Sequence, residues 1–106
     1  MTDLALIQAV LDQHIIEPEA TYSLQALGIA FGKAFIENNE SYDWWMVEDE
    51  YGRDPVIRYK ETTLLVFPQT MISQRIEDGE HVNIQSMYDG LREQLDEIRQ
   101  ENYPDA

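Results

Sequence analysis

Apolar residues recur three or four positions apart near the start of the chain, and the first such stripe predicts a helix over residues 3–16. The residue before Pro18 avoids the α region, so this helix is expected to end before Glu17. A second stripe predicts a helix from about Glu19 to Ile36. The first stripe consists of Leu4, Ile7, Leu11 and His14 or Ile15, and the second of Leu24, Leu27, Phe31 and Phe35.

Two glycines, Gly28 and Gly32, lie four residues apart on one side of the second predicted helix. Each costs about 1 kcal/mol relative to alanine inside a helix, so a compensating interaction is expected. No strand signal precedes them, and the spacing is not that of a phosphate-binding loop. We therefore expect another segment of the chain to pack closely over this glycine face.

From Tyr42 the pattern changes to the two-residue alternation of a β-strand. Gly52 marks a turn, and residues 56–59 read as the returning strand of a hairpin. Residues 62–67, TTLLVF, are apolar on both faces and predict a third strand covered by helices.

Pro68 then opens a short helix that ends at Gly79, and Asn83 is placed to cap a last helix over residues 84–101. No linker, repeat or low-complexity segment interrupts this order, so the sequence predicts a single domain over residues 1–106. The expected fold class is α+β, with about four helices packed on one face of a three-stranded antiparallel meander.

Adjacent tryptophans are the unusual feature of the first strand. Neighbouring residues of a strand point to opposite faces, so one ring is expected in the core and the other outside. Trp45 is in phase with Val47, which favours Trp45 as the core residue and Trp44 as the outward one. An outward tryptophan beside Met46 and several carboxylates is typical of the centre of a protein-binding patch.

Charge narrows the classes of partner. The 21 acidic and 7 basic residues give a formal net charge of −14. Such a field repels nucleic acid and anionic lipid and attracts basic proteins, so we expect no nucleic-acid or membrane partner. No apolar run is long enough to span a membrane, and the first 20 residues lack the basic start of a signal peptide, so a soluble cytoplasmic protein is expected.

Candidate catalytic residues are few. The chain has no cysteine, which excludes disulfides, thiolate catalysis and cysteine zinc sites. Its two histidines, His14 on the first apolar stripe and His81 in a loop, have no metal-binding spacing, and the consecutive acids Glu48, Asp49 and Glu50 alternate faces on a strand. We expect no enzymatic activity, no metal and no cofactor.

Three motifs, LGIAFG at residues 27–32, WWMVEDEYGRDP at 44–55 and FPQTMISQRIEDGE at 67–80, resemble a bacterial family known as domain of unknown function 3806. The resemblance covers roughly residues 20–90. It implies a small α+β domain and brings no catalytic residues with it. At the level of analogy it suggests the small acidic proteins encoded beside secreted toxins.

The first functional hypothesis is therefore a non-enzymatic acidic protein-binding domain, for example an immunity protein that covers the basic active site of a toxin. Its expected partner-binding residues are Trp44, Met46, Glu48, Glu50, Tyr51 and Asp54. An alternative is a small ligand-binding or enzymatic domain that uses carboxylates with Thr70, Arg75 and Glu77 near the start of a helix. A third interpretation is a homodimer in which the tryptophan patch serves only the contact between copies.

Overall fold

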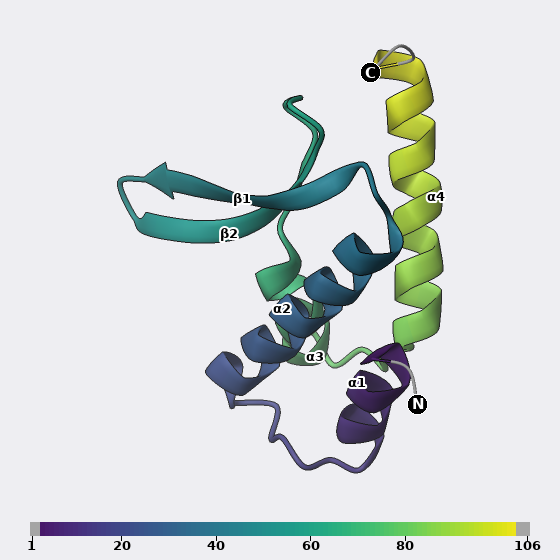
Figure 1. Cartoon of the computed structure of the whole chain (residues 1–106). Helices are drawn as coiled ribbons and strands as arrows, with labels where there is room; N and C mark the ends of the chain where they lie inside the picture. The colour runs from purple at the N-terminus through teal and green to yellow at the C-terminus, as the bar shows by residue number, and fades with distance from the viewer. Residues whose placement is uncertain (1–2, 104–106) are drawn as a thin grey trace.

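The computed structural model describes residues 3–103, and it confirms the predicted α+β fold with a three-stranded antiparallel meander (Figure 1). In chain order the elements are α1 (Asp3–Asp12), α2 (Thr21–Asn38), β1 (Tyr42–Asp49), β2 (Gly52–Tyr59), β3 (Leu65–Val66), η1 (Pro68–Thr70), α3 (Met71–Glu77) and α4 (Ile84–Asn102).

Helix α2 supplies the centre of the core. Three residues of its apolar stripe, Leu24, Phe31 and Phe35, are buried. Phe35 packs its ring against Tyr42 of β1 at 5.2 Å and against Tyr88 of α4 at 5.5 Å between centroids. The helix ends where two asparagine side chains turn back onto its last turn, Asn38 donating to Ala34 O and Asn39 to Phe35 O, each at 2.7 Å. These bonds satisfy carbonyls that a helix end leaves free, and α2 ends at Asn38, two residues after the predicted end at Ile36.

The expectation that another segment covers the glycine face of α2 is confirmed. A Cβ placed on Gly28 would lie 2.7 Å from the Gln69 carbonyl oxygen and would also meet the Pro68 carbonyl. At Gly32 it would lie 2.8 Å from the Trp44 ring and 3.0 Å from the Pro68 ring. The missing side chains thus let η1 and β1 approach the α2 backbone, and this approach offsets the helix-propensity cost of glycine.

The β1–β2 hairpin has the predicted turn. Its register runs from the pair Tyr42 and Tyr59 to the pair Asp49 and Gly52, and Gly52 has a φ of 131°, a conformation that L side chains rarely adopt. Inside the turn, the Asp49 carboxylate accepts a hydrogen bond of 2.8 Å from the Tyr51 amide. This contact is the aspartate turn geometry expected of a tight hairpin end.

The third strand is much shorter than predicted, with Leu65–Val66 in place of residues 62–67. The reason is local hydrogen bonding by Thr62. Its hydroxyl donates to Tyr59 O at 2.6 Å and accepts from the Leu64 amide at 3.2 Å, so the chain before β3 forms a turn. Side-chain to backbone bonds of this kind compete with a strand ladder.

Helix α1 also ends earlier than predicted, at Asp12 and not at residue 16. His14 has a φ of 52°, in the left-handed region that ends a helix, and its amide still donates to Leu11 O at 3.2 Å. His14 is exposed, so its predicted place on the apolar stripe is wrong. After the turn, Ile15 is exposed and Ile16 is half-buried against the core cluster.

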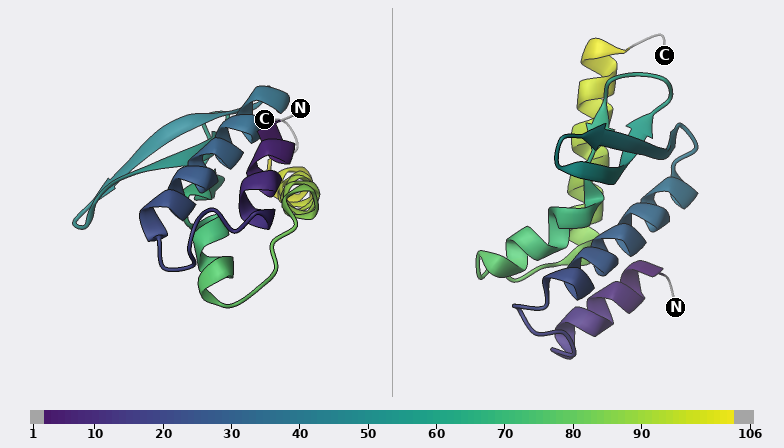
Figure 2. Two further views of the ribbon diagram at one scale, coloured as in Figure 1. Left: turned by 90° about the horizontal axis from the view of Figure 1, so that it is seen from below. Right: turned by 90° about the vertical axis from the view of Figure 1, so that its left-hand side faces the viewer.

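Helix α4 matches its prediction to within one residue at its end, Ile84–Asn102 against 84–101. The Asn83 side chain accepts a hydrogen bond of 2.9 Å from the Ser86 amide and so caps the first turn. One stripe of the helix is buried. The C-terminal part of α4 extends past the other helices (Figures 1 and 2). The buried members of the stripe are Ile84, Tyr88, Leu91 and Leu95.

Candidate protein-binding surface on the hairpin

The far half of the β1–β2 hairpin reaches beyond the helices, and Figure 1 and the left view of Figure 2 show its turn at the outside of the molecule. Its large apolar side chains remain exposed there, with 47% of Met46 and 88% of Tyr51 accessible to solvent. The base of the hairpin is buried, because Tyr42 and Ile57 join the core. The hairpin is therefore packed against the core at its base, and its turn end is exposed to solvent.

The structure contradicts the prediction that Trp45 joins the core. Trp44 shares a face with buried Tyr42 and packs over Gly32 of α2, whereas Trp45 lies on the opposite face. Neither ring enters the core, since 36% of Trp44 and 49% of Trp45 is exposed. The phase of the strand is set by Tyr42, which the core cluster buries, and not by Val47, which is only half-buried.

Trp45 was missed as a candidate binding residue, although it is the more exposed of the two tryptophans. The Arg58 guanidinium lies 3.7 Å from the centroid of its ring. Cation–π stacking of this kind holds an exposed aromatic ring in place, and about half of Trp45 remains accessible to solvent. The alternation of the strand could have identified Trp45 as outward, had it been phased on Tyr42.

Five of the six predicted partner-binding residues lie in the far half of the hairpin, on different sides of it, and Trp44 lies nearer its base, opposite Ile57. Trp44, Met46 and Glu48 share the face that looks toward α2, Asp54 lies on the opposite face, and Glu50 and Tyr51 lie at the turn. We call the six residues and Trp45 the hairpin surface. It wraps around the end of the hairpin and does not form one flat patch.

The hairpin surface is acidic. Five carboxylates lie along β1, β2 and their turn, and only Arg53 and Arg58 oppose them. Arg53 pairs with Glu48 across the strands at 4.0 Å, with both side chains largely in solvent, and Arg58 stacks on Trp45. An exposed pair of this kind adds little stability, so its charges remain available to a partner. The five carboxylates are Asp43, Glu48, Asp49, Glu50 and Asp54.

At the base of the hairpin, Tyr42 has a raised pKa. Burial disfavours the charged phenolate, the nearby Arg99 lowers the pKa in part, and Asp96 and Tyr59 raise it. Within residues 3–103 its buried hydroxyl has no hydrogen-bond partner. An unpaired buried hydroxyl destabilises the fold, while the ring itself packs on Phe35 and Tyr59.

We expect the Tyr42→Phe variant to be more stable than the parent by about 1 kcal/mol, because it removes the unpaired hydroxyl and keeps the ring. The difference should grow above pH ~10. A raised pKa in the folded state means that the wild type loses stability as the pH rises through that value, and phenylalanine cannot ionise. Urea unfolding at neutral and alkaline pH measures both effects.

Tyr88→Phe is the matched control, since the Tyr88 hydroxyl accepts a hydrogen bond of 3.0 Å from Asn39. Its removal should destabilise the protein by about 1 kcal/mol. Equal losses in the two variants would contradict the assignment of an unpaired hydroxyl to Tyr42.

The alternative candidate residues Thr70, Arg75 and Glu77 are not brought together. Arg75 donates to Met71 O of its own helix at 2.8 Å, Glu77 accepts a 3.4 Å hydrogen bond from Thr21 of α2, and Thr70 is at the start of α3. Arg75 does line an open hollow of about 470 Å³ between α3 and α4. Two carboxylates from α4, Glu93 and Glu97, share that hollow, and neither Thr70 nor Glu77 contributes to it.

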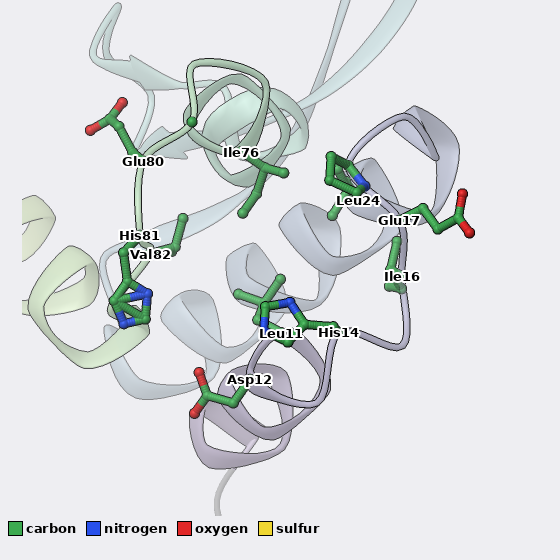
Figure 3. Close-up of a pocket in the computed structure, with 12 residues that line it drawn as sticks. Leu11, Asp12, His14, Ile16, Glu17, Leu24, Ile76, Glu80, His81 and Val82 are labelled. Carbon is green, nitrogen blue, oxygen red and sulfur yellow. The ribbon is translucent and has the colours of Figure 1, made fainter.

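Both histidines line a second hollow, of about 770 Å³, between the loop after α1 and the loop before α4 (Figure 3). His14 and His81 lie on its two sides with Asp12 near them, over an apolar floor that includes Leu11 and Leu24. Nothing in the sequence indicated that these two histidines line the same hollow. Among residues 3–103, no group of three histidines and carboxylates is arranged to hold a metal ion.

Comparison with known proteins assigns the chain to a family. It belongs to the family described as domain of unknown function DUF3806, whose model matches residues 3–88. No curated protein matches at a significant level. No helix of the described residues combines the length and the apolar character that crossing a membrane requires.

The chain is also similar to a crystal structure from Bacteroides thetaiotaomicron VPI-5482 at 1.50 Å resolution, with a TM-score of 0.75 and 25% sequence identity. The match covers 84% of this chain and 32% of that one, so the chain spans about a third of the length of the solved protein.

Proposed function

We propose that this chain is an acidic protein-binding domain that docks a basic partner protein through the hairpin surface. The observation that carries the proposal is the hairpin's far half, which reaches away from the helices (Figure 2). Trp45, Met46 and Tyr51 are exposed on the hairpin among carboxylates. A fold of this size normally buries its large aromatic rings, and a cluster of exposed ones marks an interaction site.

The two kinds of side chain on the hairpin surface serve different steps of binding. Carboxylates on a chain of net charge −14 speed the encounter with a basic partner. Their attraction for that partner weakens as salt screens the charges. The aromatic and methionine side chains supply apolar area that becomes buried in the complex, and tryptophan and tyrosine are frequent hot-spot residues. An immunity protein that covers the basic active-site cleft of a toxin is one form of this function.

Affinity capture from a lysate of the native organism tests the proposal. The wild-type chain should retain one basic protein in stoichiometric amount at low salt and progressively less as the salt concentration rises. Glu48→Lys/Glu50→Lys should weaken that retention by about 100-fold or more, because two attractive charges become repulsive at the contact. Quantitative mass spectrometry of the retained protein, followed by titration of the purified pair, measures the loss.

Glu19→Lys/Glu101→Lys is the matched control, since both glutamates are exposed and lie outside the hairpin. This variant has the same change in net charge. If the two double variants lose the partner equally, the attraction is a property of overall charge and the hairpin surface is not the docking site. If a folded wild-type chain retains no basic protein at low salt, the proposed function is wrong.

A second candidate function rests on the hollow between α3 and α4, whose lining includes Arg75, Glu93 and Glu97. A guanidinium and two carboxylates around one hollow could bind a small zwitterionic ligand. Such a ligand would raise the melting temperature of the wild type and not that of Arg75→Gln, and it would leave capture through the hairpin unchanged. Thr70 and Glu77 have no part in this version of the ligand site.

A further inference from the structure

The outer edge of β1 carries backbone groups that point away from the sheet. The sheet order is β1-β2-β3, so within residues 3–103 β1 pairs with β2 alone. The Lys60 amide donates to Ser41 O across the hairpin at 2.8 Å, and the Tyr59 amide donates to Leu64 O on the other side of β2. Antiparallel strands alternate inward and outward residues, so the amides and carbonyls of Trp44, Met46 and Glu48 face outward.

The two edges of the hairpin differ in how far they can pair with another strand. On the β2 side, β3 covers Ile57 and Arg58, and the next outward position is Pro55, which has no amide hydrogen to donate. Proline on an edge is a common device against pairing with another strand. The β1 edge has no proline, and its three outward residues all retain their amides. The open edge of the sheet is therefore the one that carries both tryptophans.

We propose that the β1 edge binds an extended segment of the partner protein as an additional antiparallel strand, and that this segment bears lysine or arginine. The proposal rests on the proposed docking function and adds the mode of recognition. Main-chain hydrogen bonds to Trp44, Met46 and Glu48 supply affinity, and side chains that alternate along the added strand supply specificity. The partner's basic residues lie opposite Asp43, Glu48 and Asp49.

Charge decides between a basic segment and a second copy of this chain. If two β1 edges paired antiparallel with Met46 opposite Met46, Asp43 of each copy would lie opposite Asp49 of the other. Like charges directly opposite each other destabilise a strand pair. A lysine-bearing strand replaces these repulsions by attractions, and apolar side chains in the alternate positions can contact Trp44 and Met46.

A short peptide is the direct probe. The sequence acetyl-Lys-Lys-Val-Val-Thr-Val-Lys-amide, run antiparallel to β1, places lysines opposite the three acids and valines opposite Trp44 and Met46. On adding it to the wild-type chain, hydrogen exchange at the amides of Trp44, Met46 and Glu48 should slow. Exchange at Trp45 and Val47 should stay constant, because their amides already point toward β2. A peptide of the same charge with proline in place of the valine opposite Met46 lacks an amide that would donate to β1, and it should produce no slowing.

Met46→Pro removes one outward amide without removing a bond inside the hairpin. Its preceding residue, Trp45, is already in a strand and so accepts a following proline. We expect Met46→Pro to weaken peptide binding about 10-fold or more, and Met46→Ala, which keeps the amide, to weaken it about threefold or less. The exchange measurement needs no variant, so it decides the matter even if Met46→Pro misfolds.

The possible outcomes distinguish failure of edge pairing from failure of the proposed docking function. If the peptide binds Met46→Pro as tightly as Met46→Ala, or slows no outward amide, edge pairing is overturned, while salt-sensitive capture lost in Glu48→Lys/Glu50→Lys still supports docking. If the wild type alone protects the same amides as its own concentration rises, the edge pairs with a second copy and the proposed segment is overturned. If the wild type captures no basic protein and binds no peptide, both proposals fall.

Discussion

The Gly28→Ala variant is expected to lose on the order of 3 kcal/mol of folding stability or more, although the change adds a single methyl group. That methyl would lie 2.7 Å from the Gln69 carbonyl oxygen and would also meet the Pro68 carbonyl. Both are main-chain atoms of η1, which cannot rotate away as a side chain could. Relief requires that η1 move off α2, which would disturb the burial of Pro68 and Ile72.

Gly90→Ala is the matched control for this prediction. Gly90 lies inside α4, and a Cβ there would have no neighbour within 4 Å among the described residues. Alanine should therefore stabilise the protein by about 0.5–1 kcal/mol through helix propensity alone. Urea unfolding followed by circular dichroism compares the two variants, and a stabilised Gly28→Ala would refute the close contact between α2 and η1.

The Phe35→Ala variant is expected to lose about 3–5 kcal/mol, the usual range for removing a fully buried phenylalanine. Phe35 has no exposed surface, and its ring contacts Tyr42 of the hairpin base and Tyr88 of α4. The three rings join α2, β1 and α4, so a cavity at Phe35 removes packing from all three elements at once. The loss is a large share of the 5–15 kcal/mol that holds a typical domain folded.

Phe67→Ala is the control with the same change in side chain. About half of Phe67, 49%, is exposed, so its truncation should cost about 1 kcal/mol or less. Denaturant unfolding measures both losses. Similar values for the two phenylalanines would mean that the aromatic cluster around Phe35 contributes little beyond ordinary surface packing.

Much of the fold could be predicted from local rules, and the elements that differ show where those rules stop. Asn83 caps α4, Gly52 supports the hairpin turn, and the glycine face of α2 is covered, each for the reason that the sequence indicated. The third strand is shorter than predicted because Thr62 bonds to the main chain around it. Apolar composition alone did not reveal that competition.

The candidate site was predicted less completely than the fold. The six predicted residues all lie on the hairpin, but Trp45, which was expected in the core, is more exposed than Trp44. A strand's alternation fixes which residues share a face and not which face the core covers. That choice depends on Tyr42 reaching Phe35 and on Trp44 reaching Gly32, contacts between elements that sequence spacing does not specify. The hollow that His14 and His81 both line could not be predicted for the same reason.

The placement of both tryptophans on β1 gives the molecule a built-in optical reporter. The chain has two tryptophans, and both lie in the hairpin, whereas the buried aromatic cluster consists of phenylalanine and tyrosine. Indole emission therefore follows the environment of β1, whereas Tyr42, Tyr59 and Tyr88 lie in the core cluster. Trp44 packs on α2, so movement of the hairpin relative to α2 would change the emission of Trp44. Trp45 stacks with Arg58 on the opposite face, so a partner that covers that face would change the emission of Trp45. Single-tryptophan variants would distinguish the two events without any attached label.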